Sequence, residues 1–441
     1  MRPALFLLSI IITISFGIPV RRDSLNNGLI LLTCEDHRLP IVDLALICRS
    51  GAGVEPKEKA GIATLCARML LRGTTKISAD SIATLLDYLG ARYSAGADFD
   101  HLYLNFRLLS KDLSSGLDLL ADLTLNPAFP NEEFIRTREE VLTAARRAYE
   151  NPGVVVAMEF DRLLFGNHRY ALPVSGDTAT IPDIKVEDLR QFHQTYLVPN
   201  NCFVIAVGDI NPQELQEAIY NRFGNWRPKP VPQPLDPEFK LPEKTVIKLI
   251  TRKDMNQTYI HFGHPGISAL DSDLIPVRLM SYILGGPPLS SRLGLAVREY
   301  AGLAYDVRCW FDRRLLTGAF RATVQTAKPA EAIKKMFIEI RRMNEAGATQ
   351  QELFKAHNYF TGSFPLTYSS NQGKLEQIKN QELYRYGTDW LETYPQKVRA
   401  TTLKQVNSTA RERLKPDHYI MVIMGNVSKD DLHLQNVEWL E

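Results

Sequence analysis

Hydrophobic and polar residues follow two different periods along the chain, and together they predict both strands and helices. Between His101 and Leu108 apolar residues occupy every second position, which is the period of a half-buried strand. Apolar runs predict further strands over 29–33, 41–48, 203–207, 245–250, 258–262, 305–311 and 319–325. Helical spacing predicts helices over 61–74, 78–90, 113–125, 131–144 and 186–196, and helices that begin near 211, 330 and 349. Strands and helices come in runs rather than in strict alternation, which favours an α+β fold with mainly antiparallel sheets.

The second half of the chain repeats the first. A proline turn leads into the strand at 203–207, and a similar turn leads into an apolar run at 420–424. Pro199 and Pro416 are as far apart as Gly208 and Gly425, and this constant offset indicates a duplicated domain. Six prolines within 225–244 predict an extended, stiff linker there. We therefore expect one domain over 25–224 and a second over 245–441.

Composition adds limits on the class of protein. The chain has 441 residues, which is too long for one core and suits two domains of about 200 residues. Hydrophobic residues make up 45% and charged residues 23%, and the net charge is +2, so we expect no nucleic-acid partner. The five cysteines are scattered without a C-x-x-C pair, which does not favour a disulfide framework. Cys48, Cys66 and Cys202 lie in apolar runs and are expected in the core.

The first 20 residues have the features of a secretory signal peptide. Arg2 supplies a positive charge, an apolar run follows over 5–16, and Ser15-Phe16-Gly17 is a small-residue cleavage site. We therefore expect a periplasmic or secreted protein with no stable membrane span after signal removal. The uncharged stretch 3–20 nearly reaches the length of a bilayer, so an uncleaved membrane anchor is the alternative.

Residues 61–74, GIATLCARMLLRGT, predict a buried helix that ends at a glycine turn. The segment resembles the motif helix of the insulinase/pitrilysin-type metallopeptidases, approximately G-L-A-H-x-x-E-H-M-L-F-x-G-T, the inverted zincin pattern. In that family the two His bind one zinc ion and the Glu activates water. The flanks match here, but Thr64 and Arg68 stand at the His positions and Ala67 at the Glu position.

The family's third zinc ligand is a Glu in a later helix that reads approximately V-L-x-E-x-R. The corresponding segment here is V-L-T-A-A-R at 141–146, which puts Ala144 at the ligand position. Alanine has no donor atom, a neutral hydroxyl is a poor zinc ligand, and a guanidinium has no lone pair to offer. A fixed positive charge roughly 5 Å from Zn²⁺ is repulsive by about 6–7 kcal/mol at an effective dielectric constant of about 20. We expect no metal or other cofactor in this chain, with Arg68 either filling part of the vacated position or pairing with a nearby acid.

A second segment, 285–305, resembles the family pattern L-G-G-G-x-S-S-R-L-x-x-x-V-R-E-x-x-G-L-A-Y. Ser290 to Leu293, Val297 to Glu299 and Gly302 to Tyr305 agree in one register. Pro287-Pro288-Leu289 and Gly294 depart from the pattern. The resemblance implies that Arg298 and Tyr305 bind the substrate backbone near the scissile carbonyl, as such a pair does when it comes from the half without zinc. The alternative is an arginine paired with Glu299 and a tyrosine packed in the core.

These observations predict two tandem metalloprocessing-peptidase-like domains that form half of a clamshell. The function they favour is a non-catalytic, substrate-binding subunit of a heterodimeric zinc metallopeptidase that cleaves peptides or unfolded polypeptides. Alone the chain would be inactive, and zinc would reside in a homologous partner with an intact H-x-x-E-H helix. A structural or assembly protein of the same fold is the alternative. A third interpretation, an autonomous peptidase with another site, is disfavoured because no nucleophile elbow, phosphate loop or catalytic-cysteine signature appears.

Overall fold

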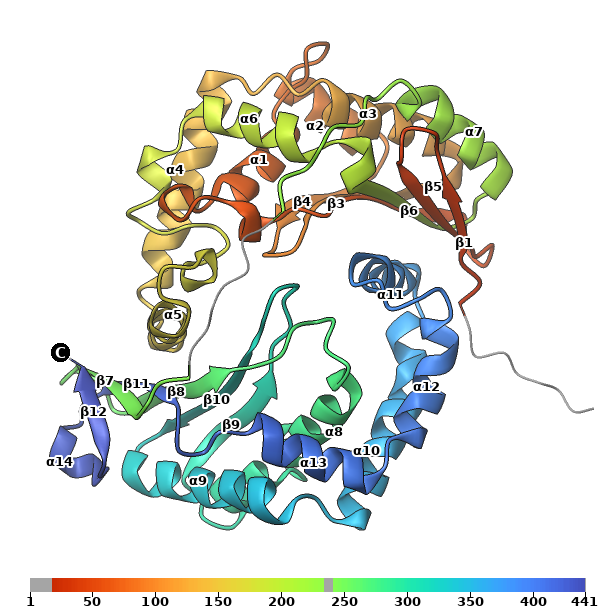
Figure 1. The fold of residues 1–441 in the computed structure, drawn as a ribbon. Helices are drawn as coiled ribbons and strands as arrows, with labels where there is room; N and C mark the ends of the chain where they lie inside the picture. Colours follow the sequence, from red (N-terminus) through yellow and green to blue (C-terminus); the bar gives the residue numbers. More distant parts are fainter. Residues whose placement is uncertain (1–17, 234–240, 441) are drawn as a thin grey trace, which may run out of the picture.

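The structure is a computed structural model that describes residues 18–233 and 241–440. Residues 1–17 of the expected signal peptide and 234–240 of the expected linker lie outside the described residues. We call residues 18–233 the first half and residues 241–440 the second half. Each half contains a six-stranded sheet, and the two sheets lie one above the other in Figure 1. Among the described residues, no helix has the length and apolar character needed to cross a bilayer.

The sheet of the first half has the strand order β1-β2-β6-β3-β5-β4. Its strands are antiparallel except for β2 and β6, which run parallel. The strands are β1 (Arg21–Ser24), β2 (Ile30–Glu35), β3 (Ile41–Cys48), β4 (Arg92–Ala97), β5 (Leu102–Leu109) and β6 (Cys202–Gly208). The helices are α1 (Ile62–Leu70), α2 (Ala79–Tyr88), α3 (Leu113–Leu125), α4 (Asn131–Ala148), α5 (Pro152–Phe165), α6 (Val186–Tyr196) and α7 (Pro212–Phe223).

The sheet of the second half has the order β12-β7-β11-β8-β10-β9. Its strands are β7 (Thr245–Thr251), β8 (Thr258–Pro265), β9 (Ala304–Phe311), β10 (Ala319–Thr326), β11 (Ile420–Gly425) and β12 (Val437–Leu440). Its helices are α8 (Leu274–Gly285), α9 (Pro329–Ala346), α10 (Gln350–Ser363), α11 (Asn371–Leu383), α12 (Trp390–Ala400), α13 (Leu403–Arg413) and α14 (Lys429–Leu432). A π-helical segment, Gly294–Glu299, follows α8.

The two sheets have the same internal order, because β2, β6, β3, β5 and β4 correspond to β7, β11, β8, β10 and β9. The registers agree as well. Ile30 of β2 lies opposite Phe203 of β6, and Val246 of β7 lies opposite Ile420 of β11. The expected α+β class, with two related halves and mainly antiparallel sheets, is confirmed.

The central strands are covered on both faces. Along β3, Ala45 and Ile47 belong to a hydrophobic cluster that includes residues of the second half, whereas Leu44 and Leu46 pack in a cluster with α1. Such two-sided burial explains why β3 reads as a nearly continuous apolar run rather than an alternating one. Each sheet has helices of its own half on its outer face (Figure 1).

The inner face of each sheet is covered by a helix from the other half. Helix α5 of the first half contacts β8 and β11, and helix α11 of the second half contacts β3 and β6 (Figure 1). Phe160 of α5 is fully buried and packs in one cluster with Val422 of β11. Neither helix is among the elements that the hydrophobic pattern predicts. Each half therefore supplies one helix to the inner face of the other half's sheet, and we call this arrangement the exchange of helices.

Ion pairs reinforce both exchanged helices. Asp161 of α5 accepts a hydrogen bond from Arg321 of β10 at 2.5 Å. In the other direction, Lys374 of α11 bonds Asp36 at 2.5 Å, and Arg49 bonds Glu382 at 2.5 Å. Such pairs, shielded from water, fix the geometry between the halves more than they add net stability.

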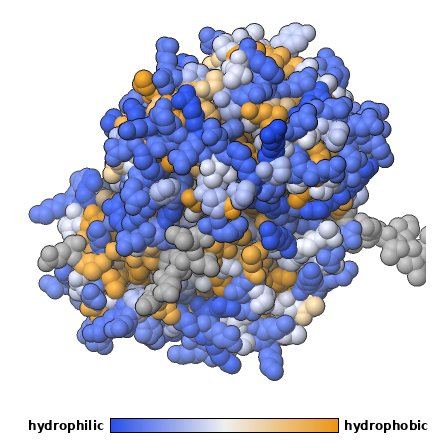
Figure 2. All heavy atoms as spheres, turned by 45° about the horizontal axis from the view of Figure 1, so that its top comes forward, coloured by the Kyte–Doolittle hydropathy of each residue, from blue (hydrophilic) through white to orange (hydrophobic). Residues whose placement is uncertain are grey.

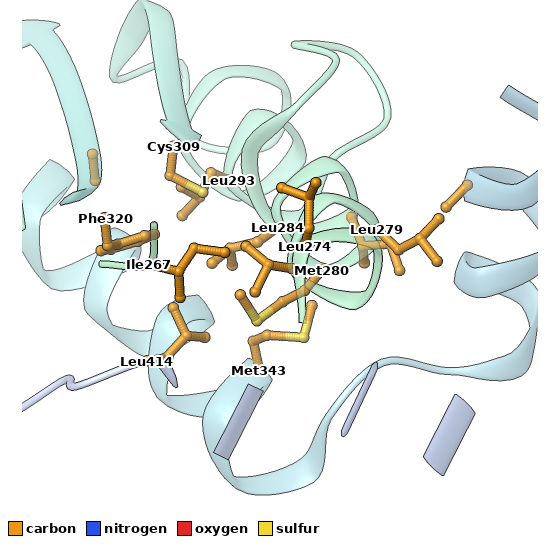
Figure 3. Packing of buried hydrophobic residues seen from close by; sticks show 14 of the residues in the cluster. Ile267, Leu274, Leu279, Met280, Leu284, Leu293, Cys309, Phe320, Met343 and Leu414 are labelled. Atoms are coloured by element: carbon orange, nitrogen blue, oxygen red, sulfur yellow. The ribbon is translucent and has the colours of Figure 1, made fainter. Parts of the chain in front are cut away.

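The second half has a large core under α8, where apolar side chains from α8, α9, β9 and β10 meet (Figure 3). Met280 and Met343 are fully buried there and lie beside Leu414. The surface is different in character. On the face shown in Figure 2, hydrophilic residues predominate and hydrophobic residues occur in small groups.

The exchange of helices can be tested at Phe160, which stacks on His261 with 4.4 Å between ring centroids. Phe160→Ala leaves a cavity between α5 and the second sheet, and we expect it to lower the free energy of unfolding by about 3–5 kcal/mol in urea titrations. Val154→Ala is the matched control, because Val154 lies on the same helix but is 37% exposed; it should change stability by less than about 0.5 kcal/mol. Equal stability of both variants would contradict the exchange.

Candidate functional site

The motif helix α1 is held firmly at its N-terminus. The buried carboxylate of Glu55 accepts hydrogen bonds from the backbone N–H groups of Gly61 and Ala63. It also pairs with Arg169 at 2.7 Å, and Arg169 in turn donates to three backbone carbonyls. A carboxylate at this end of a helix satisfies free N–H groups and complements the helix dipole. The position of α1 therefore depends on packing and on this ion pair.

The four motif positions differ in exposure and share no metal-binding chemistry. Thr64 is 7% exposed and its hydroxyl donates to the carbonyl of Val174 at 3.3 Å. Ala67 is fully buried, and Ala144 is exposed on α4, which packs against α1. Arg68 is exposed, and in the part of the chain that the structure describes its guanidinium makes no hydrogen bond or ion pair. The expected alternative in which Arg68 pairs with a nearby acid is therefore not found there.

These residues do not fit a zinc ion. Zinc in proteins takes thiolate, imidazole or carboxylate ligands in tetrahedral geometry. Thr64 already donates its proton to a carbonyl, two positions are alanines, and Arg68 brings a positive charge. Across the described ranges 18–233 and 241–440, no group of three or more His, Cys, Asp or Glu residues is placed to hold a metal ion.

The structure brings Arg298 and Tyr305 together at the start of β9. The guanidinium carbon of Arg298 lies 4.8 Å from the ring centroid of Tyr305, in a cation–π contact. Tyr305 is 83% exposed, so it is not packed in the core. Arg298 also approaches Glu299 at 3.5 Å, as one part of the alternative interpretation expects. The pair thus places a solvent-exposed phenol beside a half-buried guanidinium.

Backbone irregularities on both sides aim this pair outward. Arg298 lies in the π-helical segment, where the N–H of Tyr300 bonds the carbonyl of Leu295. Tyr305 lies where the register between β9 and β10 shifts, since Val307 opposes Val324 whereas Ala304 opposes Thr326. One extra residue in β9 is a β-bulge, which re-aims side chains. This shift explains why Tyr305 is exposed although Val307, on the same strand, is fully buried.

The two departures from the family pattern near this site, the Pro287-Pro288-Leu289 loop and Gly294, lie in contact, and each accounts for the other. A Cβ atom at Gly294 would collide with the backbone carbonyl of Pro288. The Pro287-Pro288-Leu289 loop therefore packs directly on the π-helical segment, and only glycine leaves it room. Ser291 anchors the same loop, because its backbone N–H bonds the carbonyl of Pro287 and its hydroxyl accepts from the N–H of Gly294.

A buried ion pair supports the segment that carries Arg298. Arg292 is 8% exposed and makes a bidentate pair with Glu352 of α10, with N–O distances of 2.7 and 2.8 Å. Its guanidinium also donates to the carbonyl of Gly347 at 2.8 Å. Burial disfavours the charged carboxylate, but the hydrogen bonds from Arg292 and Thr349 outweigh it and lower the pKa of Glu352 to about 2.

A cavity of about 480 Å³ lies between the two halves, and residues of both line it, among them Arg49, Asp100, Leu315 and Arg385. Asp100 joins the halves here: it accepts from the backbone N–H of Leu315 at 3.0 Å and from the hydroxyl of Tyr384 at 2.9 Å. Burial raises the pKa of Asp100. The motif positions and the Arg298–Tyr305 pair do not line this cavity. The role of Asp100 depends on contacts more than 200 residues away in the chain, which no local sequence pattern marks.

Comparisons with known proteins agree with the motif analysis. The model of the insulinase family, peptidase family M16, matches residues 31–178, and that of the peptidase M16 inactive domain matches residues 183–359. The chain belongs to the M16 (insulinase) family. Among curated relatives, a Helicobacter pylori protein named as a non-peptidase homologue, YmxG, is 25% identical over 90% of this chain and 91% of its own length. A Bacillus subtilis protein named as an uncharacterized zinc protease, YmxG, is 24% identical over 92% and 98%.

Solved structures show the same M16 architecture. A Pseudomonas fluorescens peptidase M16 inactive domain superposes with a TM-score of 0.84 at 26% identity, covering 93% of this chain and 98% of that one. One chain of complex III from Candida albicans superposes with a TM-score of 0.80 at 16% identity, covering 95% and 98%, which shows the fold alone. The chain thus joins an M16 domain, whose motif helix carries no metal ligand, to an M16 inactive domain.

Metal analysis tests whether the motif helix kept its geometry when its ligands were lost. The triple variant Thr64→His, Arg68→His and Ala144→Glu restores three ligands, with the two His on one helix face. We expect it to retain about one zinc per chain after dialysis, whereas the unchanged protein retains none. Stoichiometric zinc in the unchanged protein would contradict the account. A folded triple variant without zinc would show that α1 and α4 have moved apart.

The ion pair beneath Arg298 predicts a pH dependence. Because the folded-state pKa of Glu352 is lowered from 4.5 to about 2, its carboxylate stabilises the fold above about pH 4.5 and this contribution is lost as the pH falls toward about 2. Glu352→Gln keeps the helix cap but removes the charge. We expect the variant to have a lower Tm than wild type at neutral pH, with the difference shrinking as the pH falls through that window. A difference that stays constant across the window would contradict the assignment.

Proposed function

We propose that this protein is the non-catalytic, substrate-binding subunit of a heterodimeric zinc peptidase, whose partner carries the intact H-x-x-E-H helix. The observation that carries the proposal is a contrast between two sites. The metal position has lost every donor, whereas Arg298 and Tyr305 remain in contact with each other and the phenol of Tyr305 is open to solvent. A fold retained only as a scaffold does not need an exposed phenol in contact with a guanidinium at one place.

The position of the pair suits binding of an extended peptide. Tyr305 lies on β9, which among the described strands is at the edge of its sheet and pairs with β10. An edge strand offers free backbone N–H and C=O groups to an added strand. A peptide aligned along this edge would bring its backbone carbonyls within reach of the two side chains.

The chemistry of the pair suits a carbonyl that gains negative charge. A phenol O–H and a guanidinium N–H are both hydrogen-bond donors, and donors placed at a developing oxyanion can contribute on the order of 3 kcal/mol. The cation–π contact holds the guanidinium beside the ring and restricts both side chains. The zinc-bound water of the partner would supply the nucleophile, and this chain would hold the substrate and complete the clamshell.

The compartment follows from the N-terminal segment. Residues 1–20 have the charge and apolar pattern of a signal peptide, so we propose that the pair works in the periplasm or outside the cell. An uncleaved segment would anchor the same pair to the membrane surface.

A structural or assembly role is the second candidate, and the similarity of the fold to a chain of a respiratory complex favours it. The two functions make different demands on Arg298 and Tyr305. A scaffold would tolerate loss of the phenol hydroxyl without consequence, whereas a substrate-binding subunit would not. Peptide cleavage by the assembled pair therefore separates the two candidates.

Tyr305→Phe tests the proposal, because it removes one hydroxyl from an 83% exposed side chain and leaves packing unchanged. In the pair reconstituted with its zinc-bearing partner, we expect kcat/KM for an unfolded peptide to fall about 100-fold. Tyr300→Phe is the matched control, since Tyr300 lies five residues earlier and is 81% exposed; its kcat/KM should equal that of wild type. Co-elution in size-exclusion chromatography verifies that each variant still assembles. Full activity of assembled Tyr305→Phe would refute the role.

A further inference from the structure

Two cysteines that are far apart in the chain lie directly opposite each other in the first sheet. Cys48 is the last residue of β3 and Cys202 is the first residue of β6, and the antiparallel register pairs them. Both side chains are at most 1% exposed. Their separation along the sequence hides this pairing, which appears only when the two strands are placed side by side.

Hydrogen bonds at both ends of the β3–β6 pairing show whether Cys48 and Cys202 face each other at a hydrogen-bonded or a non-hydrogen-bonded position. The N–H of Arg49 donates to the carbonyl of Asn201 at 2.9 Å, and the N–H of Asp209 donates to the carbonyl of Ile41 at 3.1 Å. Hydrogen-bonded and non-hydrogen-bonded pairs alternate along antiparallel strands. Residues 41 and 49 occupy hydrogen-bonded positions, so Cys48 and Cys202 form a non-hydrogen-bonded pair.

Such a pair has the spacing of a disulfide. The Cα atoms of a non-hydrogen-bonded pair are about 4.5 Å apart, inside the range of about 4.4–6.8 Å that a disulfide spans. Both side chains point to the face of the sheet that α1 and α6 cover, since both belong to that hydrophobic cluster. The Cys48 thiol donates a hydrogen bond to the backbone carbonyl of Tyr196 at 3.2 Å, and both cysteines are free thiols in this structure.

The other cysteines differ from this pair. Cys34 lies on β2 and Cys309 lies on β9 of the second sheet, and neither has a cysteine opposite it in the register. Cys66 lies on α1, where its thiol faces the backbone carbonyl of Leu189 at 4.0 Å. Cys66 is near Cys48 but comes from a helix, so it is the natural competitor in a test.

We propose that Cys48 and Cys202 form a cross-strand disulfide when the chain meets a disulfide oxidant. A glutathione disulfide, or the disulfide of a thiol–disulfide oxidoreductase, would supply the oxidising equivalents. One cysteine thiolate attacks that disulfide and forms a mixed disulfide, releasing one thiol. The second cysteine then attacks the mixed disulfide, giving the Cys48–Cys202 bond and a second released thiol. The protein loses two protons and two electrons, and the oxidant gains them.

The burial of the pair determines when this reaction takes place. Burial raises the pKa of the Cys202 thiol, so the reactive thiolate is scarce in the folded protein. Oxidation therefore takes place during folding, before the helices cover β3 and β6. The bond would then close the chain between residues 48 and 202 and restrict the unfolded state. It would also fix the neighbouring Arg49 and Asn201, which line the cavity between the halves.

Thiol counting and peptide mapping test the proposal on the full chain. The protein is unfolded in guanidinium, refolded in a buffer of oxidised and reduced glutathione, alkylated after acid denaturation, and digested without reductant. We expect three alkylated cysteines instead of the five in the sequence, together with a peptide that links Cys48 to Cys202. Five alkylated cysteines, glutathione adducts only, or a link from Cys48 to Cys66 would each overturn the proposal.

Variants and stability give two independent checks. Cys66→Ala should leave the Cys48–Cys202 link intact, whereas Cys202→Ala should leave four alkylated cysteines and no link. In the unchanged chain, the oxidised form should have a Tm higher by on the order of 5 °C than the form treated with a phosphine reductant. A linked form that melts below the reduced form would show that the register strains the bond, and would contradict the geometry inferred here.

Discussion

The structure depends on one constraint: the central strands of each sheet are apolar on both faces, and the helices of the same half cover only the outer face. The inner faces are covered by α5 and α11, each supplied by the other half. Neither sheet could be exposed at this face without a large loss of hydrophobic stabilisation. Each half therefore completes the hydrophobic core of the other, and charged pairs such as Asp161–Arg321 join the two halves.

The same constraint explains how the metal site was lost without loss of the fold. Helix α1 is fixed by its buried apolar residues and by the Glu55–Arg169 pair at its N-terminus, and none of these groups is a metal ligand. Thr64 and Ala67 are compatible with the packed surroundings of the helix, and Arg68 extends into solvent. The helix is retained because the core needs it, whereas the zinc ligands were needed only for catalysis.

Much of the fold could be predicted from the sequence, because local patterns carry it. The bounds of α3 and α6 agree with the predicted helices, and Thr349 caps α10 through its hydroxyl as its position indicates. Helix α11 could not be predicted in this way. It is mostly polar, and its few apolar residues, including Leu375 and Ile378, pack in a cluster that includes the sheet of the first half. The motif residues could be located from their spacing, but the exposure of Tyr305 depends on a β-bulge that no local pattern marks.

The most direct test of the central claim is to identify the partner. The tagged chain, purified from its own host under native conditions, should carry with it a near-stoichiometric M16 relative, and mass spectrometry should find an intact H-x-x-E-H sequence and bound zinc in that relative. That result would establish this chain as the subunit without metal in a paired peptidase. Self-association alone, or a membrane complex with no such relative, would contradict the account and would leave Arg298 and Tyr305 as structural residues.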